Sequence, residues 1–157
     1  YDRNNSMSYT YTQLAVTDLA LFRALNKMFG EAFEDVDAYQ GHLPSDAYLA
    51  SLLSKPHVIA LVAQDQDEVV GGLVAYVLEK FEQDRREIYI YDLAVAEAHR
   101  RKGIATTLIN ELKRIAREKG AYVIFVQADP EDDPALKLYA SLGTREDVYH
   151  FDINPNA

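Results

Sequence analysis

Apolar residues recur along this chain with two spacings, and each spacing predicts one kind of element. An apolar residue at every third or fourth position indicates one face of a helix, as from Leu19 to Phe29. Runs of β-branched and aromatic residues indicate strands, and the almost wholly apolar run "AYVIFVQA" at 121–128 is typical of a central strand. The patterns predict strands at 9–14, 57–64, 68–81, 86–95, 121–128 and 146–153, and helices at 19–29, 46–55, 103–119 and 133–143.

Capping residues support the predicted helix boundaries. Asp18, Ser45 and Asp133 each precede a helical run, where a side-chain oxygen can accept a hydrogen bond from a free amide of the first turn. Pro134 suits the first helical position after Asp133. Residues 30–44, "GEAFEDVDAYQGHLP", are predicted to be a polar connection. The order of elements predicts an α/β (α+β) fold, with a mixed, partly antiparallel sheet and helices on both faces.

Length and composition limit the class of protein. The 157 residues fit one domain, predicted at 7–157, and residues 1–6 are predicted to be a disordered leader or a cloning remnant. The chain has no cysteine, which excludes disulfides, thiolate metal sites and a cysteine nucleophile, and its histidines show no metal-site spacing. No run approaches the roughly 20 apolar residues of a membrane span, and the first residues lack the layout of a signal peptide. We therefore expect a cytoplasmic protein with no membrane partner and no metal.

The formal net charge of −9 argues against nucleic acid as the main partner. Two interpretations of this acidity stay open, because it can provide solubility or attract a cationic ligand.

A basic turn precedes the helix predicted at 103–119. Arg100, Arg101 and Lys102 stand directly before Gly103, although cations are electrostatically unfavourable at a helix N-terminus. A bound anion would offset them, since the free N–H groups of the first turn point outward and glycine allows close approach. The stretch is neither a P-loop nor a dinucleotide fingerprint, because GxxxxGK[ST] and GxGxxG are absent. The pattern alone leaves two interpretations open, a phosphate-binding turn and an ordinary exposed basic loop.

Asp92 is a carboxylate within the apolar run 86–95, where it is costly unless it is paired, hydrated or functional. Strict alternation groups Asp92 with Ile88, Ile90 and Ala94 on one face of the strand. The residue is either a site carboxylate or an aspartate bonded to neighbouring backbone.

Two further features lie near the C-terminus. Tyr139 shares a helical face with Leu138 and Leu142, and that spacing alone favours a simple core tyrosine. The acidic loop "ADPEDDP" at 128–134 lacks the glycine and distal glutamate of an EF-hand. It is either a solvated loop or a wall that attracts cations.

Several motifs resemble those of a known family. "RRKGIA" matches the R/Q-x-x-G-x-G/A signature of the GCN5-related N-acetyltransferases, and "LYASLG" matches their second signature, LYxxxG. "EIYIYDLAV", "HRRKGIAT", "GAYVIFVQAD", "DDPA" and "HFDI" are similar to the type I aminoglycoside 3-N-acetyltransferases. The order of elements agrees from Met7 to Ile153. The resemblance also implies a β-bulge in the strand at 86–95, which would change the face that strict alternation assigns to Asp92. Asp133 stands where the superfamily usually has asparagine, which puts one side-chain contact to the cofactor in doubt.

The resemblance implies acetyl-CoA as the cofactor. Its pyrophosphate would bind the basic turn, and its pantetheine arm would lie along the edge of the preceding strand. The implied cofactor-binding residues are Leu93, Ala94, Val95, Arg100, Arg101, Lys102, Gly103, Ile104, Ala105 and Thr106.

The resemblance also implies direct acetyl transfer, with Asp92, or a water that it orders, as the base and Tyr139 as the acid that protonates the departing thiolate. The implied substrate is a gentamicin-type aminoglycoside, acetylated on the 3-amino group of its 2-deoxystreptamine ring, so the consequence would be antibiotic resistance. Its ammonium groups would meet two acidic walls. Tyr89, Tyr91 and Tyr122 could stack on its sugar rings, with ordinary residues of the sheet as the alternative. The acidic residues are Glu34, Asp35, Asp37, Asp129, Glu131 and Asp132.

A homodimer is a further implication of the resemblance. Two alternative functions stay open: an acetyltransferase of the same fold acting on a polyamine, a small metabolite or a protein amine, and a non-catalytic acetyl-CoA-binding module.

Overall fold

The structure, a computed structural model, describes residues 8–157, so the leader predicted at 1–6 lies outside it. The chain divides into two compact units, the first ending at Gln127 and the second comprising Ala128–Ala157. The first contains β1 (Thr10–Gln13), α1 (Leu19–Ala32), α2 (Val36–Gln40), α3 (Asp46–Ser54), β2 (Val58–Asp65), β3 (Glu68–Glu79), β4 (Arg86–Val95), the 3-10 helix η1 (Glu97–His99), α4 (Ile104–Glu118) and β5 (Ala121–Val126). The second contains α5 (Asp133–Leu142). The single domain predicted at 7–157 stays a prediction.

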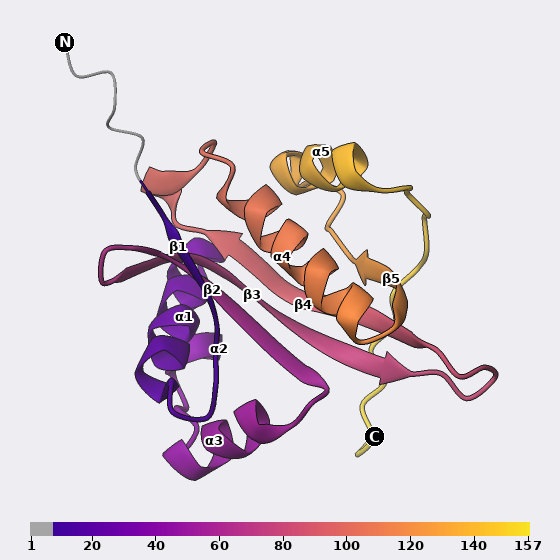
Figure 1. Ribbon diagram of the computed structural model, residues 1–157, viewed down its shortest axis with the longest axis horizontal. Helices are drawn as coiled ribbons and strands as arrows, with labels where there is room; N and C mark the ends of the chain where they lie inside the picture. The colour runs from indigo at the N-terminus through magenta and orange to yellow at the C-terminus, as the bar shows by residue number, and fades with distance from the viewer. Residues whose placement is uncertain (1–7) are drawn as a thin grey trace. The chain divides into compact units, whose positions relative to one another are not determined.

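Five strands form one sheet in the order β1-β2-β3-β4-β5 (Figure 1). The first three pairings are antiparallel, and β4 and β5 pair in parallel because α4 crosses between them. This confirms the predicted mixed, partly antiparallel sheet. No described helix is both long and apolar enough to cross a membrane.

The strand predicted at 146–153 is wrong, since residues 144–153 form no strand in the structure. Alternating apolar residues supply a face but not a pairing partner, and Tyr149 and Phe151 are 92% and 81% exposed. The central place predicted for the strand at 121–128 is wrong for a related reason. Without a sixth strand, β5 is at the end of the strand order, and Tyr122 and Val123 are exposed.

The polar connection predicted at 30–44 contains the helix α2. Asp35 caps this helix by accepting a hydrogen bond from the Ala38 amide, with 3.3 Å between the two atoms. The preceding helix α1 also runs three residues beyond Phe29, to Ala32. The cap explains why a stretch with weak apolar periodicity is nevertheless helical.

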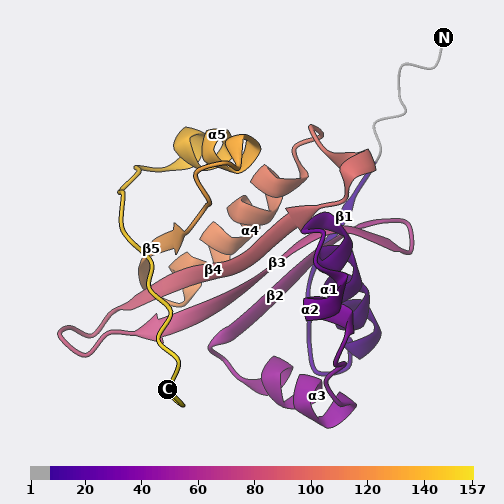
Figure 2. The ribbon, with the colours of Figure 1, turned by 180° about the vertical axis from the view of Figure 1, so that it is seen from behind.

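Two adjacent glycines in β3 bring a helix close to each face of the sheet. A Cβ on Gly71 would lie 2.9 Å from Cγ2 of Ile104 in α4, whereas a Cβ on Gly72 would clash with Leu25 in α1. Neighbouring residues of a strand point to opposite faces, so the two helices lie on opposite sides. Figure 2, turned by 180° from Figure 1, shows α1 and α2 on the face opposite α4. The helices predicted on both faces are therefore present.

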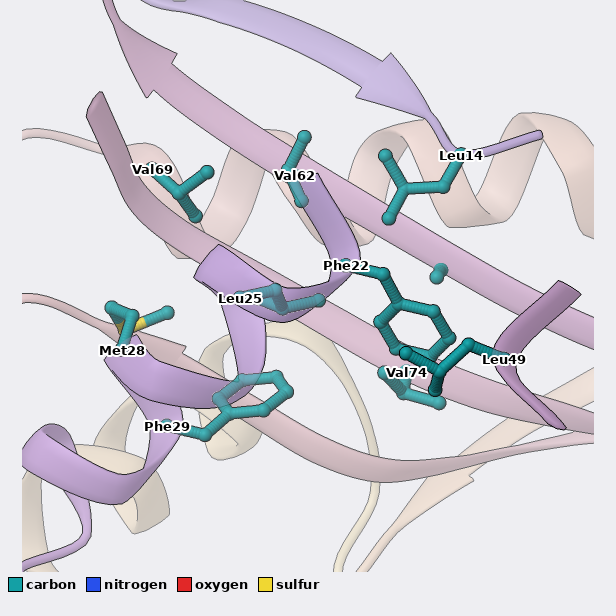
Figure 3. Close-up of a cluster of buried hydrophobic side chains, with 10 residues drawn as sticks. Leu14, Phe22, Leu25, Met28, Phe29, Leu49, Val62, Val69 and Val74 are labelled. Carbon is teal, nitrogen blue, oxygen red and sulfur yellow. The ribbon is translucent and has the colours of Figure 1, made fainter. Parts of the chain in front are cut away.

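The core cluster under α1 joins that helix to β2 and β3 (Figure 3). Leu25 and Val62 are completely buried, and Phe29 and Val74 complete the contact between the helix and the sheet. Burial of apolar area stabilises this packing at roughly 25 cal/mol per Å². The cluster fixes the face of the sheet on which the candidate site is built.

Candidate active site

Strand β4 has a β-bulge immediately before Asp92. Ala75 of β3 pairs with Ile90 whereas Val74 pairs with Asp92, so Tyr91 is the extra residue on β4. Residues directly opposite each other in a sheet point to the same face. Asp92 therefore lies on the α1 face with Val74, a member of the core cluster.

The bulge corrects the face predicted for Asp92. Ile88 and Ile90 are buried on the α4 face, and the strict alternation that groups Asp92 with them is wrong. Ala94, opposite Gly72, does share the face of Asp92. One inserted residue thus turns a carboxylate away from the α4 core and toward α2.

Tyr39 of α2 contacts this carboxylate. Its hydroxyl donates a hydrogen bond to Oδ2 of Asp92, with 2.9 Å between the oxygens. Burial raises the pKa of Asp92 above its ordinary value, and the bond from Tyr39 lowers it only in part. Burial, then the bond to Asp92, raises the pKa of Tyr39, so its phenol stays protonated and remains a donor. A half-buried carboxylate of this kind can accept a proton from a substrate.

Aromatic rings surround the bulge. Tyr91 meets Tyr76 and Tyr89 edge to face, each with ring centroids 5.9 Å apart. Tyr89 in turn stacks on Phe125 at 4.8 Å. Tyr91 is 62% exposed, although it directly precedes the half-buried Asp92. An exposed ring beside a carboxylate can bind the face of a sugar or a cation.

The strands β4 and β5 part near the bulge. Their pairing ends at Ile90 and Val126, and Leu93–Val95 pair only with β3 among the described strands. The other side of this segment therefore presents backbone N–H and C=O groups. An extended ligand can use such groups as an added strand would.

The basic turn has the geometry of an anion site. Arg101 and Gly103 both have left-handed backbones, with φ of 62° and 79°. Successive N–H groups in such a turn form a concave anion-binding surface. Gly103 is the N-cap of α4 without a side-chain cap bond, and a Cβ there would meet nothing within 4 Å. Arg100 joins the turn to β4, since its Nε donates to the carbonyl oxygen of Val95 at 3.2 Å.

The second unit contains the other predicted catalytic residue, Tyr139, on α5. Its pKa is raised to about 12 by burial and, secondarily, by the carboxylate of Asp132. The phenol is therefore protonated at neutral pH and can donate a proton. Asp132 accepts a hydrogen bond from the amide of Ala135 at 3.2 Å, so it caps α5. The cap predicted at Asp133 is wrong by one residue, since Asp133 begins the helix.

The remaining acidic residues divide between the units. Asp129 and Glu131, in the second unit, are exposed in the loop before α5. Glu34 has a left-handed backbone with φ of 54° and lines a surface cavity of about 480 Å³ together with Glu97 and Arg100. The structure thus brings Glu34 beside the basic turn.

Asp35 is near Tyr39, because its carboxylate contributes to the raised pKa of that phenol. Tyr122 is away from the bulge, with its hydroxyl donating to Glu87 and its ring 4.1 Å from the Arg85 guanidinium. Tyr39 is the contact that the sequence does not reveal. The cap Asp35 could have indicated the helix, but nothing local pairs Tyr39 with a residue of β4.

Residues 19–144, well over half of the chain, match the acetyltransferase (GNAT) family. The chain belongs to this family. GNAT enzymes use acetyl-CoA, and the protein is an acetyltransferase of GNAT type with acetyl-CoA as its cofactor. The parted strands and the anion-binding turn fit a ligand with an extended arm and a pyrophosphate, so the residues present suit this cofactor.

Solved structures of aminoglycoside acetyltransferases are similar to this GNAT protein. HMB0005, from an uncultured soil metagenomic sample, has 56% identity and a TM-score of 0.93, with 94% of this chain and 99% of that chain covered. Meta-AAC0020, from an uncultured soil metagenomic sample and in complex with sisomicin, has 35% identity and a TM-score of 0.86 over 93% and 95% of the two chains. AAC(6')-Iy in complex with CoA, at 20% identity and a TM-score of 0.74 over 96% of each chain, shares the fold.

Curated relatives are more distant. An uncharacterized N-acetyltransferase of Bacillus subtilis, YhfO, is 25% identical over 90% of this chain and 95% of its own length. N-acetyltransferase 8B of Rattus norvegicus is 27% identical over 57% of this chain, which spans only 40% of that relative's length.

Proposed function

We propose that this protein acetylates an amine of an aminoglycoside antibiotic, specifically the 3-amino group of the 2-deoxystreptamine ring in gentamicin-type compounds. The observation that carries the substrate class is the likeness to HMB0005 and meta-AAC0020 over almost the whole chain. The 3-position rests on the motifs that resemble type I aminoglycoside 3-N-acetyltransferases. Acetylation of that amine removes a positive charge, so the cellular consequence is resistance.

The cofactor-binding part of the proposal uses the turn and the parted strands. The backbone amides of 101–106 hold the pyrophosphate, with Arg100, Arg101 and Lys102 adding positive charge. Backbone groups of Leu93–Val95 hold the pantetheine arm. When bound, acetyl-CoA supplies the acetyl group as a thioester.

Two side chains move protons in the proposed mechanism. Asp92 accepts a proton from the acceptor ammonium, which must be neutral to attack because a simple aliphatic amine has a pKa of about 10. The Tyr39 bond engages Oδ2, so the proton goes to Oδ1. Tyr139 donates its phenolic proton to the sulfur of the departing thiolate. Transfer is direct, since the chain has no cysteine to carry an acyl group.

Acidic side chains attract the polycationic acceptor. The proposal assigns this role to Glu34 and Asp35 in the first unit and to Asp129, Glu131 and Asp132 in the second. The net charge of −9 supports a cationic substrate. The same charge favours a polyamine, which makes polyamine acetylation the second candidate.

The proposal includes a cytoplasmic homodimer. Large apolar side chains are exposed near the C-terminus, including Tyr149, Phe151 and Ile153. Exposed apolar surface of this kind often marks a protein interface.

The test is thiol release from acetyl-CoA with gentamicin, sisomicin and spermidine in parallel. We expect release with the aminoglycosides, and NMR of the product should place the acetyl group on N3. Acetylation at another nitrogen would reject the position alone. Release only with spermidine would reject the aminoglycoside, and acetyl-CoA binding without turnover of any amine would favour a non-catalytic module.

A further inference from the structure

Packing contacts fix the ring of Tyr39 independently of its hydrogen bond to Asp92. Its ring packs against Phe29 and Phe33, with centroids 6.0 and 5.8 Å away. Gly30 of α1 permits close approach, because a Cβ there would lie 3.2 Å from Cβ of Tyr39. The amide of Asp35 also donates to the carbonyl of Gly30 at 2.9 Å, which fixes the start of α2. The position of the Tyr39 ring therefore does not depend on its hydroxyl.

The hydroxyl of Tyr39 links two distant parts of the chain. Its bond to Asp92 spans 53 residues and connects α2 with the bulged strand β4. Bonds to a carboxylate are stronger than neutral hydrogen bonds and restrict its orientation. With a protonated phenol on Oδ2, the carboxylate has one preferred rotamer and its Oδ1 turns elsewhere.

We propose that Tyr39 is a positioning residue for the base of this enzyme: its hydroxyl fixes Oδ2 of Asp92 and thereby leaves Oδ1 to take the proton of the acceptor amine. This inference rests on the proposed acetyl transfer with Asp92 as base. It also makes the base depend on α2, the segment that follows the acidic residue Glu34. A change in the packing of α2 would alter the reactivity of Asp92 without touching it.

The groups that surround Asp92 determine how its pKa changes when the Tyr39 hydroxyl is removed. Tyr39 on α2 is the hydrogen-bond donor, and the Asp35 carboxylate at the start of that helix interacts with Tyr39. Tyr76 on β3 and Tyr89 on β4 have pKa values raised by burial, then by Tyr91, and by Asp92 itself. These phenols are neutral at assay pH, so Tyr39 is the group on this face whose loss changes the carboxylate directly.

The pH response has a definite sign. The Tyr39 bond favours the ionised form of Asp92 and lowers its pKa in part. Removing the hydroxyl raises the pKa of Asp92 further. Because the base must be ionised, the acidic limb of the kcat/KM profile then moves to higher pH.

The experiment compares wild type with Tyr39→Phe, which keeps the ring and removes only the hydroxyl. We expect kcat to fall about 10- to 100-fold, the size of loss that misplaced catalytic groups produce. KM for acetyl-CoA should stay within about twofold of wild type, since the cofactor contacts are elsewhere. The acidic limb should shift upward, and a ¹³C-carboxyl NMR titration should show the same upward shift for Asp92 without any substrate.

Tyr11→Phe is the control. It also removes a tyrosine hydroxyl, but from β1, which β2 and β3 separate from β4 in the sheet. Its kcat and pH profile should equal those of wild type. Circular dichroism and thermal melts of both variants separate a folding defect from a loss of positioning.

An unchanged kcat and an unchanged acidic limb in Tyr39→Phe would overturn the inference, and so would a fall in kcat without any shift in either titration. The assay uses whichever amine the wild type acetylates. A wrong acceptor class would therefore appear as absent wild-type turnover with aminoglycosides, and not as insensitivity to Tyr39→Phe.

Discussion

The basic turn before α4 and the group of side chains around Asp92 beside α2 are built on opposite principles. The turn uses backbone groups of consecutive residues, with Arg101 and Gly103 in left-handed conformations. The group around Asp92 uses side chains from α2, β3 and β4, and it depends on a bulge that moves one residue out of register. A site of the first kind is encoded locally and one of the second kind by the fold. Changes to the two regions should therefore have different consequences.

The largest expected effect comes from Asp92→Asn, which removes the proposed base but keeps the shape of the side chain. We expect kcat to fall about 10²- to 10⁴-fold, the usual contribution of general acid–base catalysis. Isothermal titration should show unchanged acetyl-CoA affinity, because the turn and the parted strands are intact. Wild-type turnover in this variant would mean that another group, or solvent, takes the proton.

The second effect is on the turn. Gly103→Val places a β-branched residue at φ of 79°, which costs about 1–2 kcal/mol in the bound geometry. Acetyl-CoA affinity should fall roughly tenfold, since each 1.4 kcal/mol is a factor of ten. Gly120→Val is the control, because Gly120 has φ of 72° at the other end of α4 and should lose only stability. Equal affinities of Gly103→Val and Gly120→Val for acetyl-CoA would mean that the turn at Gly103 does not bind the cofactor.

A smaller effect is expected at the aromatic rings. Tyr91→Ala removes an exposed ring beside the base, and KM for the aminoglycoside should rise about two- to fivefold, as for an exposed cation–π contact. Phe81→Ala removes a ring that is 99% exposed outside the site, and should leave KM unchanged. Steady-state kinetics at fixed acetyl-CoA measure both. A fall in kcat without a rise in KM would mean that Tyr91 stabilises the bulge and does not bind the substrate.

The smallest effect concerns stability. Burial raises the pKa of Asp92 in the folded protein, so folding favours the protonated acid. The protonated acid makes its full contribution to the free energy of unfolding below the pKa of Asp92 in the unfolded chain, about 4. That contribution is lost as pH rises through the higher pKa of Asp92 in the folded protein. Asp92→Asn should therefore melt a few degrees above wild type at pH 7. Thermal melts at pH 3.5 should show no such gain, and a lower melting temperature at pH 7 would mean that the carboxylate stabilises the fold.

The sequence was sufficient for the features that repeat or lie within one segment. The spacing of apolar residues located α1, α3, α4, α5 and the strands β1 to β5, and "RRKGIA" located the turn, because both signals are local. The same signals failed where the structure of a segment depends on pairing with a segment that is distant in the sequence. Residues 146–153 alternate like a strand, but alternation does not supply a neighbouring strand to pair with.

The candidate site was predictable only in part for the same reason. A carboxylate in an apolar strand indicated Asp92, whereas its face depended on a bulge that strict alternation does not contain and that only the family resemblance indicated. Tyr39 lay in a stretch of weak periodicity, and its partner is 53 residues away. Such contacts arise from tertiary packing, which single-chain patterns do not contain.

The glycine pair in β3 has a consequence for geometric precision. Gly71 faces Ile104, the first residue of α4 after the turn, and Gly72 faces Leu25 of α1, the helix against which α2 packs. Two adjacent residues of one strand therefore set the distance between the turn before α4 and the part of the protein that contains α1, α2 and Asp92. Small shifts elsewhere in the chain have little effect on that distance. A single methyl group added at either glycine would change that distance by displacing one of these two parts while leaving the other in place.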